Sequence, residues 1–146
     1  MINMNNGDFD ITNDSLIPSI LERTPEYYPT TINLNQAIGD YDLFTATDGA
    51  VVVEELILRC PAIIAGGALT SISVQTDTAT AHTIISAALG AVGNLTSEAE
   101  ITVTGAWLLE EGEKIQLTIN GGAHGAAYAC EVIADYNADV DGGSLA

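Results

Sequence analysis

Residues 114–119 read Lys114-Ile115-Gln116-Leu117-Thr118-Ile119, and this strict alternation of polar and apolar side chains decides the fold class. Successive side chains of a β-strand point to opposite faces, so one face of this segment is entirely apolar. The same period of two recurs within residues 56–60, 72–75 and 128–136. Strands with one apolar face are typical of an antiparallel sheet that is buried on one side.

Turn residues separate these segments along most of the chain. We expect eight strands, near residues 31–36, 41–47, 50–60, 69–76, 82–88, 99–109, 113–120 and 126–136. Between two of them, Asp48-Gly49 predicts a type I′ hairpin, whose two central residues need positive φ. Short strands at this spacing, with no amphipathic helix between them, predict an all-β fold. We expect an eight-stranded antiparallel β-sandwich that is jelly-roll-like, with an immunoglobulin-like sandwich as the alternative.

The chain divides into three parts: an extended Pro-containing N-terminal arm (1–30), the β-sandwich domain (31–136) and a polar C-terminal tail (137–146). Three of the four prolines lie in the arm and favour extended backbone. The arm also carries large apolar side chains, namely Ile17, Ile20, Leu21, Tyr27 and Tyr28. We expect these five to bind a partner subunit, because buried aliphatic and aromatic side chains dominate interface energies. The alternative is that the arm covers its own sandwich. We expect the tail to be a flexible end, unless something holds it.

The charge of the chain is strongly unbalanced. Its 146 residues include 20 acidic side chains against three basic ones, which gives a net charge of −17. Nucleic-acid binding depends on Lys and Arg at phosphates, and an anionic membrane surface repels an acidic chain. No apolar run approaches the ~20 residues that span a bilayer, and the first residues do not resemble a signal peptide. We expect a soluble protein with no nucleic acid and no membrane among its partners, and with neutral or basic protein surfaces, or cations, as binding partners.

The histidines and cysteines do not form a recognisable metal site. His82 and His124 lie in no His-x-x-x-His pattern, and Cys60 and Cys130 lie in no Cys-x-x-Cys pattern. We interpret the histidines as surface or turn residues. Both cysteines lie in apolar strand-like segments, so we expect them to be buried core residues rather than a disulfide. We expect no cofactor and no metal.

A pair of carboxylates is the strongest candidate for a catalytic site in this sequence. Glu98 and Glu100 would share one face of a strand ~7 Å apart, a spacing that glycosidases can use. Residues 137–142 match the opening of an EF-hand loop, but the chain ends before the final Glu of that loop. With so many acidic residues, such pairs arise by chance. We expect no catalytic residues and no enzyme activity.

Several segments resemble the small decoration or auxiliary proteins on the heads of tailed bacteriophages. They are Thr31-Ile32-Asn33-Leu34-Asn35-Gln36, Tyr41-Asp42-Leu43-Phe44-Thr45-Ala46, Val51-Val52-Val53-Glu54-Glu55-Leu56 and Ala106-Trp107-Leu108-Leu109-Glu110-Glu111-Gly112-Glu113-Lys114-Ile115. The resemblance implies a β-sandwich, often trimeric, that sits on the capsid lattice and braces it. It therefore implies the major capsid protein as the partner, a homotrimer, and a place on the capsid surface of the virion after assembly in the host cytoplasm.

Two other functions fit the same composition. The chain could be the base of a head fibre or a tail component, which only its location on the particle would distinguish. It could also be a carbohydrate-binding β-sandwich module, which would stack sugars on an exposed aromatic ring. That function requires Trp107 to be exposed in a groove beside Glu98 and Glu100.

Overall fold

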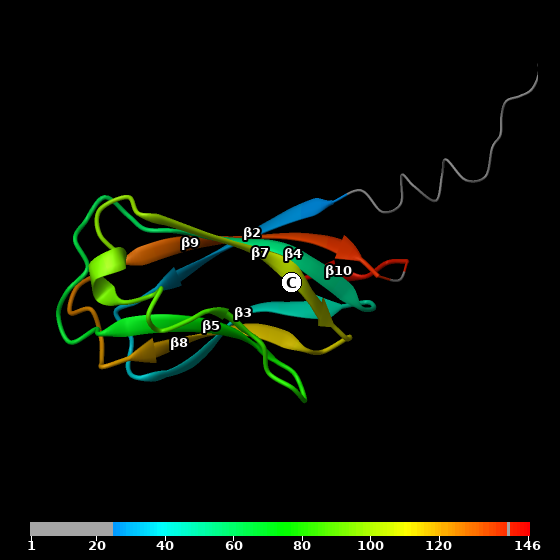
Figure 1. The fold of residues 1–146 in the computed structure, drawn as a ribbon, viewed down its shortest axis with the longest axis horizontal. Coiled ribbons are helices and arrows are strands. Elements are labelled where there is room, and N and C mark those ends of the chain that lie inside the picture. The colour runs from blue at the N-terminus through cyan, green and yellow to red at the C-terminus, as the bar shows by residue number, and fades with distance from the viewer. Residues whose placement is uncertain (1–24, 140) are drawn as a thin grey trace, which may run out of the picture.

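The computed structural model describes residues 25–139 and 141–146, which form a sandwich of two antiparallel β-sheets (Figure 1). The four-stranded sheet has the order β2 (Glu26–Asn33), β9 (Ala129–Ala138), β4 (Val51–Arg59) and β7 (Glu100–Leu109). The five-stranded sheet has the order β10 (Ser144–Leu145), β3 (Gly39–Thr47), β8 (Lys114–Asn120), β5 (Ser71–Asp77) and β6 (Thr83–Ile85). One 3₁₀ turn, η1 (Val92–Asn94), precedes β7. No helix in this part of the chain is long and apolar enough to cross a membrane.

The path of the chain identifies the sandwich as a jelly roll. From β2 to β10, each strand is followed by a strand of the opposite sheet, except that β5 and β6 are neighbours in the same sheet. This alternation is how a jelly roll winds its strands into two sheets. The predicted all-β, jelly-roll-like sandwich is confirmed, and the described residues hold nine strands instead of the expected eight.

The connection at Asp48-Gly49 differs from the expectation. Both residues have positive φ, 59° and 137°, as the sequence predicts. However, they join β3 to β4, which lie in opposite sheets, so they do not form a hairpin. A local turn signal reports the backbone angles but not the sheet to which the next strand belongs.

The core lies between the two sheets and follows the alternation in the sequence. Ile115, Leu117 and Ile119 of β8 are fully buried and belong to the same core cluster as Leu56 and Leu58 of β4 in the other sheet. Burial of each such side chain contributes about 1.5–3 kcal/mol to folding. The period of two therefore determines which face of each strand is in the core.

Both ends of the sandwich domain extend beyond their expected limits. Strand β2 begins at Glu26, inside the range expected for the arm, and pairs with β9 along its whole length. At the other terminus, Leu145 of β10 is buried, and Ala146 exchanges two backbone hydrogen bonds of 2.9 Å with Thr45 of β3. The tail expected to be flexible therefore closes one edge of the five-stranded sheet.

Antiparallel strands gather their connections at two opposite ends of the sandwich. The segments 34–38, 60–70, 86–99 and 121–128 lie at one end, on the left in Figure 1 beside η1. The segments 48–50, 78–82, 110–113, and 139 with 141–143, lie at the other end.

Candidate interaction surfaces

The first end carries almost no charge, and we call it the neutral end (34–38, 60–70, 86–99 and 121–128). Its four segments contain a single acidic residue, Glu98, and no Lys or Arg. They are instead rich in Ala, Gly and Ile, as in Ala62-Ile63-Ile64-Ala65. Of the six large apolar side chains that are exposed in the described residues, four lie here, namely Ile38, Ile63, Ile64 and Leu89. Exposed large apolar side chains that gather in one region of a surface mark a site of interaction more often than a scattered residue does.

Hydrogen bonds join the segments of the neutral end to one another. The backbone N–H of His124 donates to Leu34 O at 3.1 Å, and Ala68 N–H donates to Ala123 O at 3.1 Å. Glu98 N–H donates to Pro61 O at 2.9 Å. These bonds hold the exposed apolar side chains on a fixed framework.

His124 lies at the centre of this framework. Its ring is buried and packs on Tyr128 with centroids 4.5 Å apart. Nδ1 lies 2.9 Å from Ala126 O, and Nε2 lies 3.2 Å from Ile64 O, so the ring bridges two segments. The two segments are also closely packed, because a Cβ on Gly67 would lie 1.8 Å from His124 O. His124 therefore lies in a loop, but its ring is buried in the neutral end, so the interpretation of this histidine as a surface residue is wrong.

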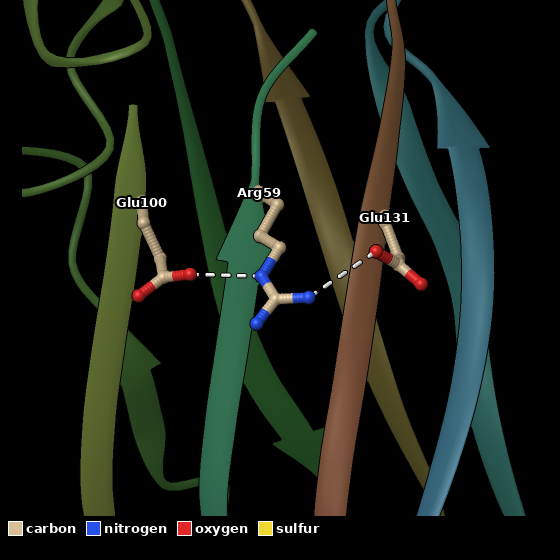
Figure 2. A network of polar contacts seen from close by, with 3 residues as sticks. All are labelled: Arg59, Glu100 and Glu131. Carbon is tan, nitrogen blue, oxygen red and sulfur yellow. Dashed lines mark hydrogen bonds and ion pairs between the residues drawn. The ribbon is translucent and has the colours of Figure 1, made fainter. Parts of the chain in front are cut away.

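A charged group next to the neutral end is balanced within the chain (Figure 2). Arg59, the last residue of β4, lies between Glu100 of β7 and Glu131 of β9. Its Nε donates to Glu100 Oε2 at 2.8 Å, and its Nη1 lies 3.6 Å from Glu131 Oε1. The hydrogen bond with Glu100 raises the pKa of Arg59. One of the three basic residues of the chain thus offsets carboxylates that border the neutral end.

The opposite end concentrates negative charge, and we call it the acidic end (48–50, 78–82, 110–113, 139 and 141–143). Its segments carry six carboxylates, namely Asp48, Glu110, Glu111, Glu113, Asp139 and Asp141. On the adjoining sheet, Asp135 of β9 lies directly opposite Glu55 of β4. Burial, and then the charge of Glu54, raise the pKa of Asp135. Asp135 and Glu54, on strands that lead to this end, therefore repel each other.

The outer face of the five-stranded sheet is a solvated hydrogen-bonded surface. Asp42 accepts hydrogen bonds from Lys114 Nζ at 2.6 Å and from Gln116 Nε2 at 2.7 Å. The bond from Lys114 is the main cause that lowers the pKa of Asp42. Asp40 accepts a hydrogen bond from Thr118 at 2.5 Å. These polar groups therefore have hydrogen-bond partners on the neighbouring strand.

A groove lies beside Trp107, near the acidic end. Its volume is ≈ 510 Å³, and its lining includes Trp107, Leu108, His82 and Glu113. Trp107 is partly buried against the core instead of being presented as a platform. Glu100 lies at the other end of β7 in the ion pair with Arg59. The arrangement that carbohydrate binding requires, Trp107 beside Glu98 and Glu100, is not formed.

The arm residues fall into two groups. Ile17, Ile20 and Leu21 lie outside the described residues. Tyr28 points inward from β2 and meets Phe44 of the other sheet edge to face, with centroids 6.0 Å apart. Tyr27 points outward and is 66% exposed. Tyr28 thus packs in its own domain, as in the alternative interpretation of the arm, and Tyr27 lies on the surface.

The structure also shows the positions of the two cysteines and of the segment that resembles the opening of an EF-hand loop. Cys60 and Cys130 are buried free thiols, as predicted. A hydrogen bond between them lowers the pKa of Cys60 to about 7 and raises that of Cys130. Asn137 belongs to strand β9 and does not begin a loop of the EF-hand kind. Within residues 25–139 and 141–146, no three His, Cys, Asp or Glu side chains come together as metal ligands.

Comparison with known proteins gives matches in structure only. The sequence matches no protein-family model and no curated protein sequence. The structure is similar to a chain of the cyanophage Pam1 capsid asymmetric unit, with a TM-score of 0.56, 15% identity, and coverage of 94% of this chain and 97% of that chain. It is also similar to a chain in the acid-stable capsid structure of Helicobacter pylori bacteriophage KHP30, with a TM-score of 0.51, 13% identity, and coverage of 85% and 94%. At these identities the comparison shows a shared fold.

The neutral end is the feature that motif analysis of the sequence missed. Its signal is the lack of charged residues in alternate connections, such as 60–70 and 121–128. Because successive strands run in opposite directions, alternate connections lie at the same end of the sandwich, so the signal was present in the sequence. A search for motifs cannot find it, because it is a pattern of missing residues.

Proposed function

We propose that this chain is a structural virion protein that decorates and braces the outer surface of a phage capsid through contacts with the major capsid protein. The observation that carries the proposal is the shared fold with chains from two phage capsid structures. Each match covers nearly the whole of the other chain, so those chains are also of about this size. A single jelly roll of this size is suited to binding on a shell that other chains build.

Charge supports a position on the outside of the particle. The interior of a phage head holds DNA at high density, and a chain with net charge −17 is repelled by phosphate. We propose a homotrimer on the capsid surface, assembled in the host cytoplasm, as the resemblance to decoration proteins implies.

The arm is proposed to reach a neighbouring subunit through Ile17, Ile20 and Leu21, with Tyr27 on β2 completing the contact. The outward side chain of Tyr27 supports this part of the proposal. Because β2 begins at Glu26, a shortened chain that lacks residues 1–24 keeps every described strand.

Cryo-electron microscopy of particles that carry this protein tests the location. We expect ordered density for the jelly roll on the outer capsid surface. Density confined to a tail or to a head fibre would contradict decoration and support the fibre-base or tail alternative.

Co-sedimentation with particles that lack this protein tests the arm. We expect Ile20→Asp and Leu21→Asp, in the full chain, to reduce the bound fraction at least roughly tenfold, because a buried anchor becomes a charge. Ile2→Asp is the matched control outside the anchor cluster and should bind like the unchanged chain. If all three variants bind as well as the unchanged chain, the arm does not make the contact with the capsid.

A further inference from the structure

The neutral end has the composition of an interface core. The centres of protein interfaces are depleted in charged residues and rich in apolar side chains. Ile63 and Ile64 expose 49% and 71% of their surface, and Ile38 and Leu89 are exposed on neighbouring segments. The other large apolar side chains that are exposed in the described residues, Tyr27 and Leu108, are single residues on strands.

The framework under these side chains is already rigid. His124 bridges residues 64 and 126 through its ring, and Gly125 N–H donates to Asn35 Oδ1 at 3.0 Å. The Tyr128 hydroxyl donates to Leu95 O beneath the surface. A surface that is ordered before binding loses little conformational entropy when it binds, so its apolar area contributes more fully to affinity.

Charge limits what can cover this end. A basic partner would be attracted to the acidic end and to the carboxylates of the sheets, and it would gain nothing from a surface with no counter-charge. The occupant must therefore be neutral and apolar. The same end of another copy of this chain meets that condition.

Contact between two copies through any other surface is opposed by the net charge of −17 on each copy. Strands of up to ten residues separate the neutral end from the acidic end by ~30 Å. This distance exceeds the Debye length of ~8 Å at physiological salt. Copies that meet by their neutral ends thus keep their acidic ends beyond the range of strong repulsion.

We infer that the neutral end, centred on Ile63 and Ile64, is the surface through which copies of this chain associate. The inference rests on the homotrimer in the proposed function and gives that trimer its contact surface. Three neutral ends meet at the symmetry axis, and the three acidic ends point away from it. Closed rotational symmetry of this kind is the usual arrangement of homo-oligomers.

Matched substitutions in the full chain test the inference. Ile63→Glu at the neutral end is compared with Leu108→Glu, because these side chains are 49% and 48% exposed. Ile64→Glu, at a side chain that is 71% exposed, is compared with the same Leu108→Glu control. The molar mass of each variant is measured by light scattering over a range of protein concentrations, and circular dichroism verifies the fold.

We expect the unchanged chain and Leu108→Glu to be oligomeric. Ile63→Glu and Ile64→Glu should raise the concentration for half-assembly at least roughly tenfold, because each copy brings a carboxylate into the contact. If these two variants assemble like the unchanged chain, the contact lies elsewhere and only this inference fails. A monomeric unchanged chain would overturn both the inference and the homotrimer, and capsid binding would still be tested by microscopy.

Salt provides a second measurement that needs no variant. Raising NaCl from about 0.05 to about 0.5 M should strengthen association, because salt screens the repulsion between acidic bodies and leaves an apolar contact intact. Weaker association in high salt would mean that opposite charges hold the copies together, which contradicts a neutral contact.

Discussion

The two ends of the sandwich are built by the same kind of strand connection, yet their chemistry is opposite. The neutral end has one acidic residue, exposed isoleucines and a buried histidine that joins its segments. The acidic end has short connections that carry six carboxylates. The jelly-roll fold requires neither composition. The difference in charge between the two ends therefore comes from the sequence of their connections. A rigid apolar surface suits contact with protein, and a charged one suits water.

Glycines at the two ends should differ most in their tolerance of substitution. Gly67→Ala at the neutral end places a Cβ against His124 O at positive φ, whereas Gly112→Ala at the acidic end meets nothing within 4 Å. We expect Gly67→Ala to lower the free energy of unfolding by about 2–4 kcal/mol, from overpacking and backbone strain. Gly112→Ala should cost only about 1–2 kcal/mol, from strain alone. Urea denaturation measures both, and equal losses would show that the neutral end is not tightly packed.

The two histidines should differ in the same direction. His124→Leu removes ring contacts with two carbonyl groups and changes the buried packing of the ring on Tyr128, and should cost about 1–3 kcal/mol. His82→Leu, at an exposed position of the acidic end, should change stability by less than about 0.5 kcal/mol. Thermal denaturation at neutral pH measures both variants. A loss for His82→Leu as large as for His124→Leu would contradict the bridging role.

Removal of one carboxylate should stabilise the crowded region near the acidic end. Asp135→Asn removes a partly desolvated charge and its repulsion with Glu54, and should add a few tenths of a kcal/mol at neutral pH. In the unchanged chain the pKa of Asp135 is raised in the folded state, so its ionisation destabilises the fold above that pKa. The advantage of Asp135→Asn should therefore disappear as the pH falls through this pKa and the carboxyl takes up a proton. Unfolding curves at neutral pH and near pH 3 test this, and an advantage that persists in acid would exclude charge as its cause.

The smallest expected effect concerns the ion pairs beside the neutral end. Arg59→Met leaves Glu100 and Glu131 without their shared cation and should lower the melting temperature slightly at low salt. The loss should shrink as salt is raised, because these groups are exposed. Lys114→Met, which breaks the pair with Asp42, is the comparison on the other sheet. A loss for Arg59→Met that is independent of salt would indicate that the side chain contributes by packing instead.

Part of the interaction surface was predictable, and the rest required the fold. The charge-free segments 60–70 and 121–128 are visible in the sequence, as are the apolar residues Ile63 and Ile64. That these segments are joined through the ring of His124 was not, because a histidine in a Gly-rich loop looks like a surface residue until its neighbours are known. The anchors of the arm show the same limit. Tyr27 and Tyr28 are adjacent and similar, and only the pairing of β2 with β9 turns one outward and the other into the core.

By itself, the sequence determined the all-β class, the inward face of most strands, the free buried cysteines and the excess of negative charge. These features follow from period-two alternation and composition, which are properties of neighbouring residues. Tertiary structure alone decided that Asp48-Gly49 crosses between sheets, that Glu26 starts a strand and that Leu145 closes an edge. Each of these depends on which distant strand offers free backbone groups and an apolar face, and long-range pairing of that kind is not written in local sequence.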